Sequence, residues 1–448
     1  MMRISRFQPL RRPGRCLLLG LGLVGLLEPG AASAQEQLTF EAAVRLALAQ
    51  NERALKAPLR VRAAEGQLIR ARSEFLPSLN TGGSGTLGSS EDRAGRLLTG
   101  SATLTLTQPL INLSAIPLYA QSRHQLESER WGAVQDKRLV AFDTARAFLV
   151  VLTSERVHEA ATRRLERARA NQQNAEVRAQ AQIASTNDVT RAILETTAAA
   201  REVAQADGSV ARARLALGFL IGQPVAGALA APDRTTQAAE STALGTEELV
   251  RAAQDRRPDI RAAKERTAAL YQAAREPLFR LAPVLAATGQ GRLTTAAVAS
   301  EPFYSGTVQL NLGWEIYDAG ARYGDRRTRT AQAESQALDE RLLRRSVATD
   351  VGVALASLAA ARESYRISEE AVAAAQRNTA ETELLYKQGL ARAIELIDAN
   401  ARRFDAEVSR ATAKLAMEQA YLELRFALGL DPVDDSSETA AAPQGGAP

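Results

Sequence analysis

The sequence predicts an α+β protein in which very long helices dominate, and three observations support this fold class. Proline is absent from residues 118–223 and again from residues 303–431, and proline is the residue that most strongly interrupts helices. Apolar residues within these stretches recur every seven positions, which is the period of coiled coils. Short segments elsewhere alternate apolar and polar residues, which is the pattern of β-strands.

The chain also repeats itself weakly, at an almost constant offset of about 206 residues. The offset aligns Pro77 with Pro283 and, with one residue more, Phe219 with Phe426. Further aligned pairs are Leu38 with Leu244, Glu41 with Glu247, Val44 with Val250, Arg45 with Arg251 and Gly222 with Gly429. We therefore predict two copies of one unit, with the first at residues 35–240 and the second at residues 241–430.

Each copy is predicted to contain the same elements in the same order. A helix of about 35 residues comes first, then a proline, two short strands, a very long helix, a brief break and a final helix. The longest helices are expected at 115–181 and 320–388. A rise of 1.5 Å per residue gives each of them a length of roughly 100 Å, so each needs a partner along its length.

Heptad positions indicate how these helices pack. Large residues recur at Val351, Leu358, Tyr365 and Val372, with small residues between them at Ala354, Ala361, Ser368 and Ala375. The final helix carries Ile394, Ala401, Val408, Leu415 and Leu422 at the same period. Alternating large and small side chains predict close antiparallel packing. On the helices alone, a long soluble coiled-coil scaffold is an equally good interpretation.

The alternation of apolar and polar residues is strongest in residues 308–316. One face of this predicted strand consists of Val308, Leu310, Leu312, Trp314 and Ile316, and the other carries Gln309, Asn311 and Glu315. Such a strand suits a barrel with lipid outside and water inside. The alternative is a half-buried strand of a small soluble sheet. Weaker strand patterns lie at 78–89, 102–107 and 283–293, and the loops at 90–95 and 299–302 are polar.

Two strands per copy make four per chain, and four strands cannot close around a water-filled pore. An open sheet in a bilayer would leave the backbone groups of its two edges unpaired, which is costly in lipid. If the strands enter a membrane, several chains must therefore contribute to one barrel.

Both ends of the chain are expected to lie outside the repeated units. Basic residues up to Arg15 are followed by an apolar run at 16–27 and by small residues that end at Ala34, so residues 1–34 are predicted to be a signal peptide. The apolar run is shorter than a membrane-spanning helix. Residues 431–448 have few side chains to bury and are predicted to form a disordered tail.

Composition excludes several classes of function. Removal of residues 1–34 would take away five arginines and one glutamate, which leaves no cationic surplus for binding nucleic acid. The single cysteine, Cys16, lies in the same segment, and His124 and His158 lie far apart without clustered metal ligands. A phosphate-binding glycine loop and a catalytic constellation are both missing from the sequence. We therefore expect no enzyme, no cofactor and no metal site.

Taken in order, these features resemble the TolC-like outer-membrane efflux protein family, also called the outer membrane factors. Residues 38–48 resemble the opening helix of that family, residues 257–263 resemble its copy in the second half, and the similarity extends over roughly residues 38–430. The resemblance implies a homotrimer in the outer membrane of a Gram-negative bacterium. Four strands from each chain would form one transmembrane barrel of twelve strands, above an α-helical tunnel that extends into the periplasm.

The resemblance also implies the function and the partners. The chain would be the outer-membrane channel subunit of a tripartite efflux system or a type I secretion system. It would conduct substrates passively, in contact with outer-membrane lipid, a periplasmic adaptor (membrane fusion) protein and an inner-membrane pump. A soluble periplasmic coiled-coil scaffold and an adaptor protein are the alternatives. An adaptor is expected to carry β-rich domains around one helical hairpin, whereas this sequence predicts two hairpins.

By the same resemblance, the two turns between the long helices receive functional roles. The inward-facing periplasmic gate would be formed by Glu395 and Asp398. The latch that holds neighbouring helices together would involve Tyr386, Asp188 and Arg392. The turns that contact the adaptor would contain Gly389, Leu390, Ile183 and Ala184. The alternative for the gate and latch residues is an ordinary solvated face of a coiled coil.

Two departures from the family pattern concern these turns. Gln182 stands where the family usually has glycine in the first turn. In the second turn Ala391 stands where the family has the arginine of its latch, and Arg392 follows one place later. The closing contacts are therefore expected to differ in detail from those of the family.

Overall fold

The computed structural model describes residues 37–88, 97–183, 185–241, 247–295 and 302–433. The predicted signal peptide, the residues 90–95 and most of 299–302 in the strand-connecting loops, and Ala184 lie outside these ranges. The described residues from Leu38 onward belong to one compact unit. The predicted tail begins inside it, because Val433 packs against the core and Asp431 pairs with Arg138. The prediction of disorder is therefore wrong for residues 431–433, and the rest of the tail is not described.

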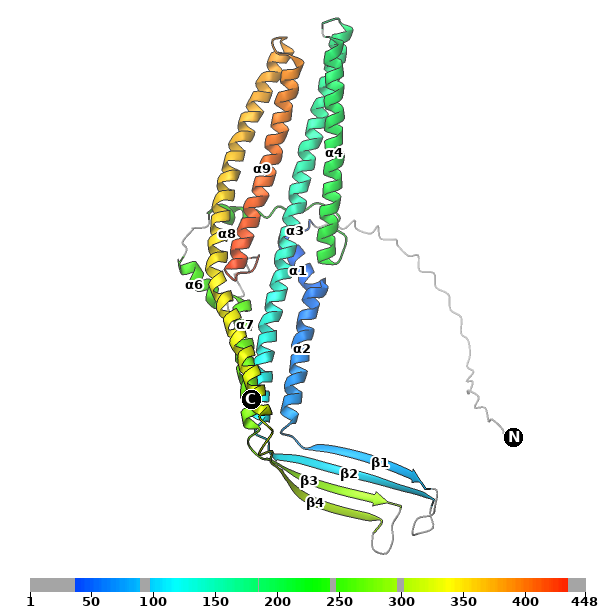
Figure 1. Cartoon of the computed structure of the whole chain (residues 1–448). Helices are drawn as coiled ribbons and strands as arrows, with labels where there is room; N and C mark the ends of the chain where they lie inside the picture. Colours follow the sequence, from blue (N-terminus) through cyan, green and yellow to red (C-terminus); the bar gives the residue numbers. More distant parts are fainter. Residues whose placement is uncertain (1–36, 89–96, 184, 242–246, 296–301, 434–448) are drawn as a thin grey trace, which may run out of the picture. The chain divides into compact units, whose positions relative to one another are not determined.

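The order of elements is the same in the two halves of the unit (Figure 1). The first half contains α1 (Phe40–Gln50), α2 (Glu52–Ser73), β1 (Ser78–Leu87), β2 (Leu98–Ile111), α3 (Ala115–Gln180) and α4 (Thr186–Ile221). The second half contains α6 (Glu247–Arg256), α7 (Pro258–Phe279), β3 (Val284–Thr294), β4 (Tyr304–Gly313), α8 (Ala321–Lys387) and α9 (Ala393–Ala427). A short helix, α5 (Asp233–Ser241), lies between them.

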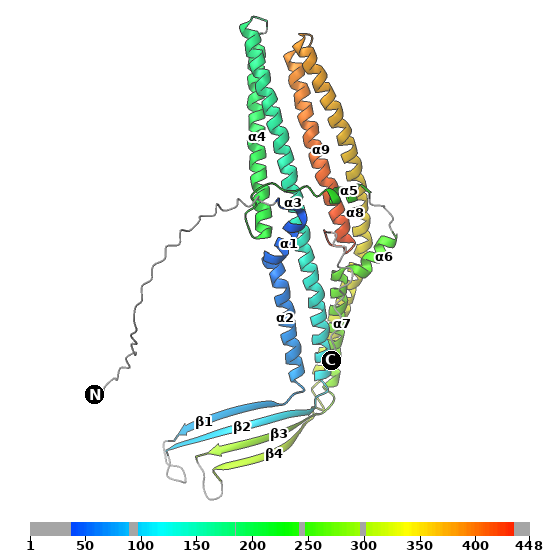
Figure 2. The ribbon, with the colours of Figure 1, turned by 180° about the vertical axis from the view of Figure 1, so that it is seen from behind.

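The predicted fold class is confirmed, and the two long helices have 66 and 67 residues, with ends within one residue of the predicted ones. Each long helix turns back into the next helix, so that α3 with α4 and α8 with α9 form two antiparallel hairpins. The strands lie at one end of the helices and the hairpin turns at the other, as both Figure 1 and the reverse view in Figure 2 show. The boundary predicted at residues 240 and 241 falls at the end of α5 and stays a prediction.

The first helix of each copy is broken, so the prediction of one helix of about 35 residues is wrong. Asn51 has an extended backbone and its side chain accepts a hydrogen bond from the backbone N–H of Arg53, which ends α1 and caps α2. In the second half Arg257 precedes Pro258 and is extended, with φ −60° and ψ 121°. Proline disfavours the helical conformation in the residue before it, which separates α6 from α7.

Heptad packing joins α8 to α9. The four large residues predicted to pack, Val351, Leu358, Tyr365 and Val372, are buried. They meet small residues on α9, because Ala413, Ala420 and Ala427 belong to the same apolar cluster as the first three. Alanine opposite a large side chain lets two antiparallel helices approach closely, as the pattern predicted.

The heptad predicted on α9 faces a different neighbour. Leu422 is fully buried among residues of α1 and α3, and Leu415 packs against the same cluster. Ile394, at the start of the heptad, is exposed. Since α9 lies between α8 and α3, it buries two strips of its surface. A period of seven in the sequence does not reveal which strip meets which neighbour.

Outside the core cluster, the α3–α4 hairpin is packed mainly by alanine. Buried alanines recur every seven residues on both helices, at Ala161, Ala168 and Ala175 on α3 and at Ala192, Ala199, Ala206 and Ala213 on α4. A methyl group buries little apolar area, so this hairpin gains less from the hydrophobic effect per turn than the α8–α9 hairpin.

The four strands form one antiparallel sheet in the order β1-β2-β3-β4. The last pair of β3 and β4 joins Val284 to Gly313. The residue before Val284 is Pro283, which has no backbone N–H to donate, so pairing ends there. The strand predicted over 308–316 is therefore correct only as far as Gly313, and Trp314 and Ile316 follow it.

The two hairpin turns use the same left-handed backbone conformation with different residues. Gly389 has φ +79° in the second turn, and Gln182 has φ +60° in the first. A side chain in this conformation brings its Cβ too close to the backbone, at a cost of about 1 kcal/mol. Gln182 therefore holds the first turn under a small strain that glycine would avoid.

We predict that Gln182→Gly raises the thermal midpoint of the protein in detergent by roughly 1 to 2 °C, since up to about 1 kcal/mol of strain is removed from a large protein. The matched variant Gly389→Ala introduces the strain into the second turn and should lower the midpoint. Differential scanning calorimetry or scanning fluorimetry measures both. A lower midpoint for Gln182→Gly would contradict the assignment of strain.

Candidate functional site

The sheet separates its side chains into two chemically different faces. The strand registers place side chains at alternating positions on the same face. One face carries Leu79, Thr81, Gly83, Gly85 and Leu87 of β1, Leu98, Gly100, Ala102, Leu104 and Leu106 of β2, Leu285, Ala287, Gly289, Gly291 and Leu293 of β3, and Tyr304, Gly306, Val308, Leu310 and Leu312 of β4. This face is apolar apart from the hydroxyl groups of Thr81 and Tyr304 and the amide of Gln108, which lies opposite Ala287 at the helical end of β2.

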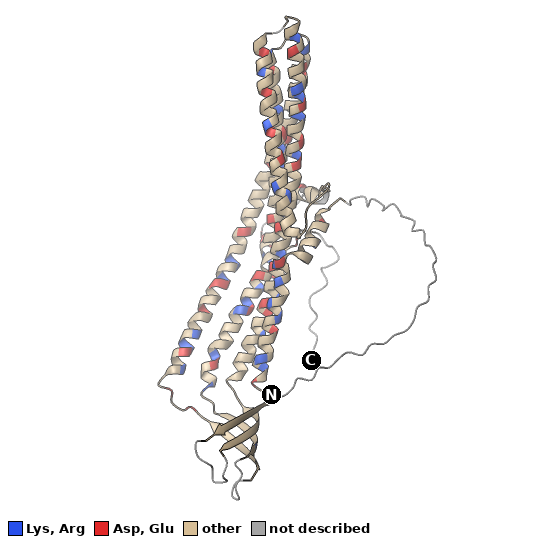
Figure 3. Ribbon diagram, turned by 90° about the vertical axis from the view of Figure 1, so that its right-hand side faces the viewer, with Lys and Arg blue, Asp and Glu red and all other residues tan. Residues whose placement is uncertain are grey.

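The opposite face is rich in hydroxyl and amide groups. Side chains there bond across the strands: the Ser84 and Ser101 hydroxyls lie 2.9 Å apart, and Asn311 Nδ2 donates to Thr288 Oγ1 at 3.1 Å. Arg292 is the one charged residue in the four strands and lies on this face. Figure 3 shows the contrast, because charged residues cover the helices and are nearly missing from the strands.

The side chains of the apolar face are exposed in the single chain. Leu310 is 70% exposed and Val308 is 86% exposed, and most other leucines of this face are exposed as well. Aromatic residues stand at both ends of β4: Phe303 and Tyr304 at its start, and Trp314 just after its end, where the indole Nε1 donates to the carbonyl of Leu281. A contiguous apolar surface of this kind marks a site of contact with lipid or another apolar partner. Three of the predicted lipid-facing residues, Val308, Leu310 and Leu312, therefore share one open apolar face.

In the described parts of the chain, no helix has the long apolar stretch that crossing a bilayer requires.

At the other end of the helices, the predicted gate residues Glu395 and Asp398 lie on the first turns of α9, and both are exposed. Leu396 and Ala399, next to them in the sequence, are buried, so the two carboxylates lie on the outer side of the helix. The Asp398 carboxylate pairs with Arg402 at 3.0 Å, and both groups are exposed.

The structure gives Asp188 a local contact. Asp188 Oδ2 accepts a hydrogen bond from the Ser185 backbone N–H, while the Ser185 hydroxyl caps the start of α4. This reciprocal arrangement satisfies two backbone donors that the first turn would otherwise leave free. The spacing of Ser185 and Asp188 in the sequence is the signal that could have identified it.

The predicted latch residue Tyr386 contacts an arginine that the sequence did not single out. The guanidinium of Arg178, in the last turn of α3, lies 4.5 Å from the centroid of the Tyr386 ring. Its Nη1 donates to the Tyr386 carbonyl at 3.2 Å, and its Nη2 donates to the Lys387 carbonyl at 3.4 Å. A cation is favoured at the carbonyl end of a helix, so Arg178 both stacks on α8 and caps it.

The remaining tip residues are arranged as follows. Arg392 is the N-cap of α9, and its backbone carbonyl accepts hydrogen bonds from Glu395 and Leu396. Ile183 and Leu390 are strongly exposed, and Gly389 supplies the left-handed turn. The two turns thus present apolar side chains to their surroundings. Ala184 lies outside the described residues.

Two further arginines connect the hairpins between their tips and the core. Arg164 on α3 is nearly buried, bonds to Glu195 and Glu202 of α4 at 2.9 and 2.7 Å, and stacks on Phe404 of α9. Its neighbour Arg163 pairs with Glu407 of α9 at 3.3 Å. An ion pair and a cation–π contact therefore join α3 to α9 in this region, and apolar contacts of Leu415 and Leu422 join them nearer the core.

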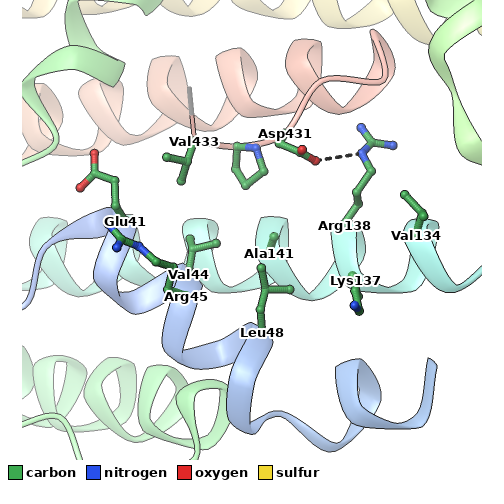
Figure 4. A pocket seen from close by; sticks show the side chains of 11 residues that line it. Glu41, Val44, Arg45, Leu48, Val134, Lys137, Arg138, Ala141, Asp431 and Val433 are labelled. Atoms are coloured by element: carbon green, nitrogen blue, oxygen red, sulfur yellow. Dashed lines mark ion pairs between the residues drawn. The ribbon is translucent and has the colours of Figure 1, made fainter. Parts of the chain in front are cut away.

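At the level of the core, Arg138 on α3 closes the contact with α9. Its guanidinium donates to the Leu430 carbonyl at 2.8 Å, pairs with Asp431 at 3.4 Å and lies 5.3 Å from the Phe426 ring. Figure 4 shows the pair with Asp431 beside a pocket that α1 also lines. Burial lowers the pKa of Arg138, and the carboxylate of Asp431 opposes this shift.

Comparison with known structures identifies the fold. A CusC structure superimposes with a TM-score of 0.77 at 16% identity, covering 88% of this chain and 93% of that one. The outer membrane protein VceC of Vibrio cholerae gives 0.72 at 16%, covering 88% and 97%. The CmeC outer membrane channel of Campylobacter jejuni gives 0.75 at 15%, covering 89% and 87%. Among curated proteins, none matches the sequence.

The sequence itself matches the family described as outer membrane efflux protein, over residues 43–223 and again over residues 249–430. The two matched segments make up most of the chain, and each contains one hairpin and one pair of strands. The chain belongs to the outer membrane efflux protein family and is an outer-membrane channel subunit of an efflux system.

Proposed function

We propose that three copies of this chain assemble into one passive conduit. Their sheets would form a barrel of twelve strands in the outer membrane, and their hairpins would form a tunnel in the periplasm. The observation that carries this proposal is the two-faced sheet, which has lipid-compatible side chains on one side and hydroxyl groups on the other. Its outer edges at β1 and β4 have no partner strand within the described chain. A soluble coiled-coil scaffold or an adaptor gives no reason for such an exposed apolar face.

The assembly can be tested directly. The protein should be recovered from the outer-membrane fraction only with detergent, and the purified oligomer should give discrete conductance steps in planar lipid bilayers. Release of the protein by an osmotic wash without detergent would refute the channel and favour the scaffold.

We also propose the partners and the direction of transport. The exposed Ile183 and Leu390 at the hairpin turns offer small apolar surfaces that suit the end of a periplasmic adaptor. An inner-membrane pump, of an efflux or type I secretion system, would supply the energy. The chain itself would only conduct.

The acids on α9 are proposed to form the periplasmic gate. Glu395 and Asp398 are three residues apart on one side of the helix, and both are exposed in the single chain. If the first turns of α9 from three chains meet near one axis, six carboxylates surround the passage. Such a ring attracts cations and repels anions.

The first test of this gate is the double variant Glu395→Ala with Asp398→Ala. Removing the ring should lower the preference of the channel for cations by several-fold and weaken block by multivalent cations, measured as reversal potential and current in planar bilayers. The matched control removes two exposed acids from α6, Glu247→Ala with Glu248→Ala, and should change neither quantity. Equal selectivity in the two double variants, with normal oligomer yield, would refute the gate.

We propose that Arg178 acts in the latch together with Tyr386. The stacking and the two hydrogen bonds tie the end of α8 to the end of α3. A cation–π contact contributes about 0.5 to 1 kcal/mol at exposed sites, and hydrogen bonds from a charged donor add to it. Together they bias the hairpins toward the closed arrangement of their tips.

Arg178→Ala should therefore raise the resting conductance several-fold, since about 1 kcal/mol changes an equilibrium roughly fivefold. Arg178→Lys keeps the charge but loses the planar stacking, and should give an intermediate value. The exposed Arg169, earlier on the same helix, provides the control Arg169→Ala with unchanged conductance. A conductance of Arg178→Ala equal to that of the parent channel would remove Arg178 from the latch.

The strand faces give another prediction. Leu310→Arg places a cation on the apolar face and should destabilise the membrane-inserted barrel by roughly 2 to 4 kcal/mol near the bilayer midplane. Asn311→Arg, on the hydroxyl face, should be tolerated. Oligomer yield in detergent and its resistance to heat measure both effects. Equal yields would show that the apolar face does not meet lipid.

A further inference from the structure

The internal repeat provides a template for the contact between copies. Within the chain, α3 of the first half packs against α7 and α9 of the second half, and β2 pairs with β3. The repeat relates α3 to α8, α7 to α2 and α9 to α4, and it relates β2 to β4 and β3 to β1. Applying it once more to these contacts would pack α8 against α2 and α4 and would pair β4 with β1. In the described parts of the chain these elements make no comparable contact. A second copy is the one partner that can supply the missing step with the same geometry.

Equivalent residues of α4 and α9 are buried alike on one face of the two helices and differ in exposure on the neighbouring face. Leu217 and Ile221 on α4 are buried, and so are their repeat equivalents Leu424 and Leu428. On the neighbouring face Leu422 is 0% exposed, whereas its equivalent Leu215 is 74% exposed. Phe426 packs edge-to-face on Phe142 of α3, and its equivalent Phe219 is 78% exposed.

Leu422 and Phe426 are covered by α3. The repeat equivalent of α3 is α8, so α8 is the helix expected to cover Leu215 and Phe219. Arg138 and Phe142 of α3 lie over Phe426, with the Arg138 guanidinium 5.3 Å from the ring. The repeat equivalents of these two residues on α8 are Arg344 and Ala348. Arg138 is 6% exposed, while Arg344 is 43% exposed and bonds to Glu340 on its own helix. Both halves thus have an arginine at this position, but among the described contacts only Arg138 lies against an aromatic ring, that of Phe426.

We propose that α8 of one copy covers Leu215 and Phe219 of the next, with the Arg344 guanidinium stacked on Phe219. This inference rests on the proposed assembly of several copies and assigns the surfaces that meet. This contact is favourable because a guanidinium is attracted to the face of an aromatic ring. It also removes the exposed side chains of Leu215 and Phe219 from water.

The same repeat also pairs the two open edges of the sheet. Applying the repeat to the β2–β3 register brings β4 beside β1 of the next copy, with Leu310 opposite Gly85 and Leu312 opposite Gly83. All four residues lie on the apolar face, so that face continues across the junction without interruption. A one-residue shift would place Leu310 beside the hydroxyl face and is therefore disfavoured.

Charge complementarity supports the helical part of this interface. Within the chain, the Ser128 hydroxyl on α3 donates to the Ala262 carbonyl on α7 at 3.0 Å. The repeat equivalents of these residues are Glu334 on α8 and Lys56 on α2, which are exposed and of opposite charge. The contact between copies would therefore bring a carboxylate close to an ammonium group.

Cysteine cross-linking tests the assignment in the assembled protein. The chain contains one natural cysteine, Cys16, which is replaced by serine. Two differently tagged copies are expressed together, one with Phe219→Cys and the other with Ala348→Cys, and mild oxidation should join the two tags in one covalent species. The control Val353→Cys, also exposed and about 140° around α8 from Ala348, should give at least about fivefold less product with Phe219→Cys.

Charge exchange provides a second measurement that needs no disulfide geometry. Lys56→Glu and Glu334→Lys should each reduce the yield of oligomer severalfold, and the double variant should restore it. Light scattering of the detergent-solubilised protein measures the oligomeric state. Oligomers that form neither the cross-link between positions 219 and 348 nor the charge rescue would overturn this interface while leaving the proposed channel standing. A protein that stays monomeric in the membrane would overturn both.

Discussion

The structure depends on one geometric constraint: in a hairpin of two helices, each helix can bury only one strip of its surface against the other. A helix of 66 residues that packs on one partner buries a single strip, and the rest of its circumference meets water or another helix. α3 satisfies this constraint by contacting α1, α2, α4, α7 and α9. It is the central element of the chain, and its arginines at 138, 163, 164 and 178 contact α8 and α9 of the second half.

The two hairpins meet this constraint differently. The α8–α9 hairpin places large residues opposite alanine, whereas the α3–α4 hairpin, outside the core cluster, places mainly alanine on both helices. The second arrangement is thinner and less strongly held, and Arg164 compensates by binding Glu195 and Glu202 across it. Near the core the halves are joined by buried aromatic rings, and toward the tips by single arginines. Separation of the tips therefore disrupts few contacts, while separation of the core would expose Leu422 and its neighbours.

Much of this fold could be predicted from the sequence, because its signals are local. Long proline-free stretches indicated the helices α3 and α8, whose predicted ends lie within one residue of the observed ones, and Pro77 and Pro283 marked the starts of two strands. The break at Asn51 was missed because a capping asparagine is a weak signal, and the equivalent break in the second half was missed although Pro258 marks it. Among the candidate site residues, Asp188 follows Ser185 at capping distance, which is also local. The contact of Arg178 with Tyr386 joins residues 208 positions apart, and no spacing in the sequence indicates it.

The composition of the sheet has a consequence for the order of events during biogenesis. Its strands are rich in glycine and contain one charged residue, and glycine weakens a strand before it is packed. In water, strands with an apolar face and two open edges are prone to pair with any other exposed edge. The helices, by contrast, carry their own backbone hydrogen bonds and many charges (Figure 3). A chain crossing the periplasm can therefore form its helices first and leave the sheet unformed until lipid and neighbouring strands are both at hand, so that membrane insertion and subunit association become a single step.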